Sequence, residues 1–261
     1  MLLTNKTAIV YGASGAVGGA VAKSFASHGA RVFLAARDRK GLEAVATDIR
    51  GAGGQAEVAP VDATDKVAVE AHLGEIADAA GPVDIMFNAI AWGDTQGQLL
   101  TEMPLDRVLL PVNTALTTWF HTGTALAQHM STNGRGVIVG ITANAAREAF
   151  AHVGGFGIAC AAVEHYLRQL AVENGPAGVR VCWVRSPGSP DAPGVREAWQ
   201  LRANELGISF DDVHRDFARD TPLRKVTALA QVADAAVLLA SDLAAGMTAT
   251  MANATGGAQV D

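Results

Sequence analysis

Three glycines near the N-terminus have the spacing of a turn that could bind phosphate. Gly12, Gly15 and Gly18 follow the β-branched run Thr7–Tyr11 and precede an alanine-rich helical pattern. Glycine lets a backbone approach a pyrophosphate closely, and the first amides of the following helix then point at it. Such glycines can also serve only to start a helix, but their position after the first strand of a βαβ unit favours a dinucleotide site.

The end of the second apolar run bears on the identity of the dinucleotide. An acidic side chain there would bind the ribose 2′-hydroxyl of NAD, whereas an arginine would accommodate the 2′-phosphate of NADP. The run ends Ala35-Ala36-Arg37-Asp38, so an arginine stands just past the strand end. Asp38 can equally cap the next helix, and a simply solvated Arg37 is the alternative. We therefore expect NADP(H) rather than NAD(H) as the cofactor.

Strands that end side by side are needed to bring these groups together. Short apolar runs alternate with amphipathic helical patterns such as Val17–His28, Lys40–Arg50 and Lys66–Ala79. This alternation predicts an α/β fold: a single Rossmann-type doubly wound domain over residues 1–261, with a mostly parallel sheet of about seven strands and helices on both faces. The expected strands are Thr7–Tyr11, Arg31–Ala35, Ala56–Pro60, Val83–Phe87, Gly136–Ile141, Val179–Val184 and Thr248–Asn253.

One segment interrupts the alternation. Residues 186–220 contain Pro187, Pro190 and Pro193 and follow the sixth expected strand, at the carboxyl edge of the sheet. Ligands bind at that edge in open α/β sheets. Because long insertions in compact domains are often functional, we interpret this segment as a substrate-side flap. A plain surface excursion is the alternative.

Composition narrows the classes of function. The 261 residues carry a formal net charge of -6 without clustered lysine and arginine, which argues against a nucleic-acid surface. No apolar stretch reaches the roughly 18 to 20 residues that span a bilayer, and no leader is recognised before the first strand. The two cysteines, Cys160 and Cys182, lie in apolar stretches, so we expect no disulfide framework, and a cytoplasmic location. We assign no residue to a metal site.

Further motifs follow the later strands. Asp62 in Val-Asp-Ala, Asn88 in Phe-Asn-Ala and the pair Pro187-Gly188 accompany the glycine turn. Together they resemble the short-chain dehydrogenases/reductases over nearly the whole chain. The turn departs from the family's usual Thr-Gly-x-x-x-Gly-x-Gly and is similar to the spacing of its extended and atypical branches. The resemblance implies cofactor contacts from Gly12, Ser14, Gly15, Val17, Gly18, Arg37, Asp62, Ala63, Asn88, Ala89, Pro187 and Gly188.

The resemblance also implies that the catalytic positions have lost their usual residues. Enzymes of the family use a tyrosine as general acid, a lysine four residues later that lowers the tyrosine pKa, a serine that orients the substrate and an asparagine that holds a water. The tyrosine, lysine and serine positions are Phe156, Cys160 and Ala143 here, and only Asn113 keeps the family identity. The chain is thus identified as an atypical member with a degenerate catalytic tetrad.

The inventory of residues excludes a displaced Tyr-x-x-x-Lys pair. The chain has two tyrosines, Tyr11 and Tyr166, and no lysine between Lys66 and Lys225. Tyr166 lies ten residues beyond Phe156, about 15 Å farther along a helix. The motif cannot therefore be restored by a shift in alignment.

A few side chains near the lost tetrad could substitute for it. His152 could act as an acid or base near neutral pH, or could be a solvated loop residue. Cys160 could be a nucleophilic thiolate, or a small buried hydrophobe. The catalytic candidates are Asn113, Thr142 and His152. Spacing gives no support to Asp94, Glu148 or His121.

Three functions remain open at this point. The first is an NADP(H)-dependent oxidoreductase with a non-standard proton donor, acting on an unknown small molecule, since the cofactor carries the hydride chemistry. The second is a lyase, cyclase or isomerase on the same scaffold, and the third is a non-catalytic dinucleotide-binding or subunit protein. The resemblance also implies a homo-oligomer, a tetramer or dimer, in which helices at Asp106–Thr132 and Val153–Glu173 pair across a two-fold axis.

Overall fold

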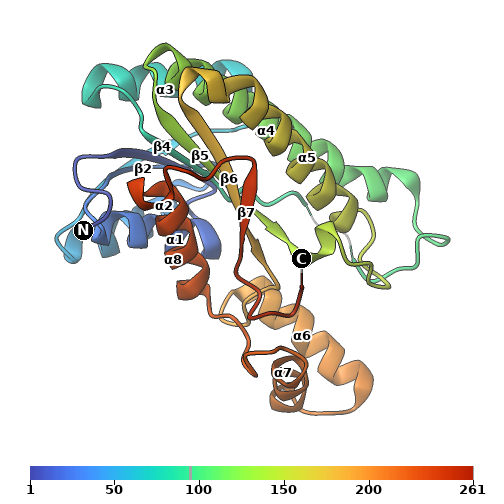
Figure 1. The fold of residues 1–261 in the computed structure, drawn as a ribbon. Coiled ribbons are helices and arrows are strands. Elements are labelled where there is room, and N and C mark those ends of the chain that lie inside the picture. Colours follow the sequence, from blue (N-terminus) through green and yellow to red (C-terminus); the bar gives the residue numbers. More distant parts are fainter. Residues whose placement is uncertain (94–95, 261) are drawn as a thin grey trace.

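Seven strands form one sheet in the order β3-β2-β1-β4-β5-β6-β7 in the computed structural model, which describes residues 1–93 and 96–260 (Figure 1). Every neighbouring pair is parallel. The predicted α/β class is confirmed, and the strand ends differ from the expected ones by at most two residues. The strands are β1 (Thr7–Tyr11), β2 (Arg31–Ala36), β3 (Gln55–Pro60), β4 (Ile85–Asn88), β5 (Gly136–Ala143), β6 (Val179–Ser186) and β7 (Thr250–Asn253).

The burial of the central strands explains why they appear as apolar runs in the sequence. All residues of β1 and β4, in the middle of the sheet, are buried, whereas the edge strand β3 is exposed at both ends. Strands covered on both faces read as continuous apolar segments. Because β1 lies between β2 and β4, the strand order reverses there, and in open α/β sheets ligands bind at the carboxyl ends of the strands at such a reversal.

Helices cover both faces of the sheet. One layer contains α1 (Ala16–Ser27), α2 (Arg39–Gly51) and α8 (Leu229–Ala240), and the other contains α3 (Lys66–Ala80), α4 (Leu105–Thr132) and α5 (Phe156–Asn174). The last of these begins later than expected, because His152 and Gly154 have left-handed backbones, with φ of 66° and 58°. In the described part of the chain, no helix is long and apolar enough to cross a membrane.

The segment after β6 folds into a helical hairpin formed by α6 (Pro193–Leu206) and α7 (Phe210–Arg219). Trp199 stacks on Phe217 with ring centroids 4.3 Å apart, and it packs with Ala203 and Val213. In Figure 1 the hairpin projects from the sheet beyond the end of β6. The hairpin therefore has a small apolar core of its own.

Candidate functional site

The glycine turn after β1 leaves the start of α1 open to a ligand. A β-carbon on Gly12 would lie 2.4 Å from the Ala89 carbonyl oxygen, and one on Gly18 would lie 2.3 Å from the Gly12 oxygen, so both positions require glycine. Gly15 is the exposed N-cap of α1 and offers no side-chain cap. The first amides of a helix have no acceptor within it. This turn therefore fits a pyrophosphate.

The start of α2 lies against the same turn. A β-carbon on Gly41 would lie 2.6 Å from Asp38 Oδ2 and 2.9 Å from Ser14 Cβ. Asp38 is the N-cap of α2, but its side chain accepts no capping hydrogen bond. Arg37 and Asp38 are both exposed at this edge. A cation and a carboxylate thus flank the position expected for the adenosine ribose.

Asp62 lies beside this edge, after β3. Its Oδ1 accepts hydrogen bonds from Thr64 N at 2.9 Å and Thr64 Oγ1 at 2.8 Å. These bonds, and to a smaller extent the charge of Arg37, lower the pKa of Asp62. The next residue, Ala63, is buried, and its carbonyl oxygen lies 3.2 Å from Nδ1 of His121 on α4. His121 thus supports the loop that follows β3, a role that spacing alone did not indicate.

Asn88 shapes the turn after β4. It is buried, and its Nδ2 donates to Thr122 Oγ1 of α4 at 3.0 Å. Its Oδ1 accepts from Ile90 N at 3.0 Å, while Ala89 N donates to Tyr11 O at 3.0 Å. The amide therefore holds the end of β4 to α4 and places Ala89 next to the glycine turn.

The residues at the family's tyrosine and lysine positions lie in apolar surroundings. Phe156 is the first residue of α5, and its ring centroid is 6.0 Å from that of Trp92. Cys160, one turn later, is fully buried in the layer between the sheet, α4 and α5. Ala143, at the end of β5, packs against the same layer. This placement supports Cys160 as a buried hydrophobe rather than an accessible thiolate.

The structure gives Thr142 an internal partner. It is buried on β5, and its hydroxyl donates to Glu164 Oε1 of α5 at 2.9 Å. The same carboxylate accepts two bonds from the buried Arg185 of β6, at 2.9 and 2.7 Å. Sequence reasoning missed this group. The available signal was a charged residue that extends the apolar run of β6.

The other catalytic candidates lie on α4 and on the loop before α5. Asn113 lies on the exposed side of α4, whereas Ala115 and Thr118 of that helix are buried. His152 is exposed, and its carbonyl accepts from Gly97 N at 2.8 Å. Glu148 accepts from Asn144 Nδ2 at 3.2 Å, and Asp94 lies outside the described residues. The direction of each side chain around its helix and the conformation of the loop before α5 set these positions. Residue spacing predicts neither of them.

Neither tyrosine is placed to replace the missing general acid. Tyr11 is buried with its ring edge toward His72, and burial raises the pKa of Tyr11 well above its usual value. Tyr166 donates to Trp119 O at 3.2 Å, and burial raises its pKa as well. Tyr11 is thus enclosed in the core at the end of β1, and the Tyr166 hydroxyl is bonded to a backbone carbonyl of α4.

The Pro187-Gly188 turn follows β6 directly. Gly188 has φ of 87°, and its amide donates to Ser186 Oγ at 3.3 Å. The positive φ bends the chain toward α6, away from the strand direction. A β-carbon on Gly188 would lie 3.4 Å from Val195 Cγ1 of α6, so the turn lies between the end of β6 and the hairpin.

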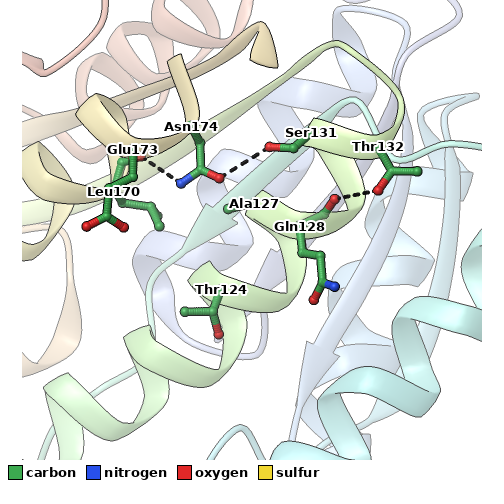
Figure 2. A pocket seen from close by; sticks show the side chains of 8 residues that line it. All are labelled: Thr124, Ala127, Gln128, Ser131, Thr132, Leu170, Glu173 and Asn174. Carbon is green, nitrogen blue, oxygen red and sulfur yellow. Dashed lines mark hydrogen bonds between the residues drawn. The ribbon is translucent and has the colours of Figure 1, made fainter. Parts of the chain in front are cut away.

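A separate groove of ≈ 520 Å³ lies between the far ends of α4 and α5 (Figure 2). Ser131 Oγ donates to Asn174 Oδ1 across it at 3.2 Å. This groove is at the opposite end of α5 from Phe156. The candidate site is therefore formed by the carboxyl ends of the strands and the glycine turn, and this groove is separate from it.

Comparison with known proteins identifies the family. A family model described as enoyl-(acyl carrier protein) reductase matches residues 12–259. This chain belongs to the short-chain dehydrogenase/reductase family. The match includes the glycine turn, α5 and the segment after β6.

Relatives within the family align over nearly the whole chain. The uncharacterized oxidoreductase YxbG of Bacillus subtilis is 31% identical over 98% of this chain and 91% of its own length. The 7alpha-hydroxysteroid dehydrogenase of Escherichia coli is 27% identical over 98% of this chain and 94% of its own. Among solved structures, NAD+-bound xylitol dehydrogenase has a TM-score of 0.90 at 21% identity, covering 98% of this chain and 100% of that one. The similarity to the xylitol dehydrogenase structure shows that the two chains have the same fold.

Proposed function

We propose that the protein is an NADP(H)-dependent oxidoreductase that does not use the family's Tyr-Lys proton donor. The observation that carries this proposal is the contrast between an open glycine turn with an exposed Arg37 and an apolar face at Phe156 and Cys160. Its substrate is a small molecule. Because the site lacks the family's proton donor, it favours substrates whose reduction needs no proton from the protein.

The residues at the carboxyl edge fit a nicotinamide dinucleotide. The first amides of α1 would hold the pyrophosphate, Arg37 the 2′-phosphate, and Asp62 the adenine amino group. Pro187 and Gly188 would lie beside the nicotinamide, which supplies hydride when bound. Solved relatives have been obtained with NAD+ and with NADPH, so the preference for NADP(H) is carried by Arg37 and by the absence of an acid at Ala36.

We call the side chains of Ala143, Phe156 and Cys160 the reaction face. This face favours substrates that need little acid catalysis. Phe156 has no proton to donate, and Ala143 offers no hydrogen bond to a developing alkoxide. A substrate with an activated C=C or C=N bond, protonated by water, would tolerate these losses. The apolar ring pair of Phe156 and Trp92 would exclude water from one side of such a substrate.

A second candidate is a non-catalytic dinucleotide-binding or subunit protein. The complete burial of Cys160, and the internal pairing of the Thr142 hydroxyl with Glu164, favour it. In that case the cofactor would stabilise the fold or an assembly without turnover.

Calorimetric titration with NADPH and NADH, followed by a turnover assay, tests both candidates. We expect NADPH to bind more tightly than NADH, and NADPH to be oxidised with conjugated enones or imines. Binding without turnover on any such substrate would favour the non-catalytic candidate. Absence of binding by either dinucleotide would contradict both.

We also propose that the protein is a homo-oligomer that uses the outer face of α4. Leu109, Leu116 and Phe120 are exposed there and flank Asn113 at helical spacing. An apolar stripe of this kind is usually covered. Phe120→Asp should lower the mass measured by light scattering, whereas Val67→Asp, on α3, should not. A monomeric wild type at micromolar concentration would contradict this proposal.

A further inference from the structure

A buried set of charged and amide groups links α5 to the C-terminal segment. Arg185 is 1% exposed, and its Nε and Nη2 donate to the two carboxylate oxygens of Glu164 at 2.9 and 2.7 Å. Its Nη1 donates to Gln259 Oε1 at 2.8 Å. Buried charges are tolerated only when they are paired and hydrogen-bonded. The guanidinium is therefore fixed in orientation, and it holds the Gln259 side chain. The Gln259 backbone is held as well: its oxygen accepts from Asn253 Nδ2 at 2.9 Å, and its amide donates to Thr255 Oγ1 at 3.3 Å.

The C-terminal segment rests in turn on the connection from α7 to α8. Gly256 O accepts from Leu223 N at 3.2 Å. A β-carbon on Gly257 would lie 2.7 Å from Pro222 Cγ, so the Pro222 ring packs directly against the Gly257 backbone. In Figure 1 the C-terminal segment runs from β7 toward the hairpin and back to the sheet. These contacts join the C-terminal segment, two or three residues before Gln259, to the connection.

The connection from β6 to the start of the hairpin is also held in place. Asp191, between β6 and α6, accepts from Leu229 N at 3.1 and 3.0 Å. Leu229 is the first residue of α8, so the carboxylate caps that helix. The hairpin itself has the small core around Trp199. The hairpin is therefore a small packed unit that is attached to the rest of the domain at both of its ends.

We propose that Arg185 and Gln259 are positioning residues that hold the α6–α7 hairpin close to the carboxyl edge of the sheet. They do so by pressing the C-terminal segment against Pro222 and Leu223. The connection that leads into the hairpin contains Pro187 and Gly188, so displacement of the hairpin alters the nicotinamide side of the site. This last step rests on the proposed function, whereas the control of the hairpin does not.

Hydrogen–deuterium exchange of the whole protein, without ligand, tests the control of the hairpin. In Gln259→Leu we expect amides of residues 193–219 to exchange at least about threefold faster than in the wild type, because local opening becomes easier. Gln259→Glu keeps an acceptor for Arg185, and exchange should be no faster than in the wild type. Gln55→Leu, at the start of β3, is the matched control. Unchanged exchange of the hairpin in Gln259→Leu, or an equal acceleration across β1–β6, would overturn the proposal.

The dissociation rate constant of NADPH tests the coupling to the site. Gln259→Leu should raise it about threefold or more, while Gln259→Glu and Gln55→Leu should match the wild type. An unchanged rate constant together with faster exchange of the hairpin would overturn the coupling. If the wild type binds no dinucleotide, the proposed function fails, and the exchange experiment still decides whether Gln259 controls the hairpin.

Discussion

The two ends of the carboxyl edge differ in what their polar groups do. At the β1–β2–β3 end, the open N-terminus of α1, Arg37 and Asp62 face outward. At the β5–β6 end, Thr142 and Arg185 are buried and bonded to Glu164, and apolar side chains stand at the positions that the sequence resemblance assigns to the catalytic residues. The polar groups of the first end are open to solvent, whereas those of the second are bonded inside the protein. On the proposed function, cofactor binding and acid catalysis would therefore depend on separate residues.

The largest expected effect concerns carbonyl reduction. We expect the wild type to reduce simple ketones near the detection limit, because loss of a positioned general acid costs about 10²- to 10⁴-fold in rate. Combining Ala143→Ser, Phe156→Tyr and Cys160→Lys should raise NADPH-dependent reduction about 10²-fold or more, as measured by NADPH absorbance. Because Cys160 is fully buried, the lysine loses hydration, and the melting temperature should fall.

Two further variants control that experiment. Phe156→Leu, which adds no proton donor, should leave ketone reduction at the level of the wild type. Strong ketone reduction by the wild type that His152→Ala abolishes would identify the imidazole as the replacement acid. Strong activity that His152→Ala leaves unchanged would contradict our account of the reaction face.

The next effect concerns the pyrophosphate position. Gly15→Asp places a carboxylate at the N-terminus of α1, where the cofactor phosphates are expected. At an effective dielectric of about 20, like charges about 6 Å apart repel by about 3 kcal/mol, so Kd for NADPH should rise about 100-fold. Gly15→Ala is the control: in both variants the β-carbon would meet the Gly12 oxygen at a close 3.3 Å, so the two differ only in the carboxylate. Equal affinities for NADPH in the two variants, measured by calorimetry, would place the phosphates elsewhere.

A smaller and more selective effect is expected at Arg37. Arg37→Ala should weaken NADPH binding about 10- to 100-fold, because a charge-assisted hydrogen bond contributes about 1.5–3 kcal/mol. NADH lacks the 2′-phosphate and should lose little affinity. Arg39→Ala, two residues later on α2, controls for the general loss of positive charge. Equal losses for NADPH and NADH would count against the assigned role of Arg37.

The smallest effect concerns the titration of Asp62. Thr64 lowers the pKa of this carboxyl through two hydrogen bonds. Since the folded-state pKa lies below the ordinary value, the associated stability is present above that value and is lost as the pH falls through the folded pKa. Thr64→Val should raise the pKa of Asp62 toward its ordinary value in an NMR titration. Thr47→Val, which removes a hydroxyl bonded to Glu43 O, should leave it unchanged.

Much of the cofactor end could be predicted from local sequence. Gly18 is required by a backbone contact within the βαβ unit itself, whereas Gly12 is required by the Ala89 backbone after β4; Arg37 and Asp62 directly follow strands. The ends of β5 and β6 could not be predicted so well. Both strands run two residues past their expected ends, as far as Ala143 and Ser186. Their polar residues Thr142 and Arg185 fit the buried sheet because Glu164 of α5 accepts their hydrogen bonds.

The sequence by itself determined the alternation of strands and helices, the parallel sheet, the glycine turn and the absence of a Tyr-x-x-x-Lys pair. These follow from the period of apolar residues and from residue identity, which need no distant partner. Only the tertiary structure decided that Asn113 is exposed, that Cys160 is buried, and that Gln259 meets Arg185. Each of these depends on side-chain direction or on contacts between residues far apart in the chain, which no local pattern contains.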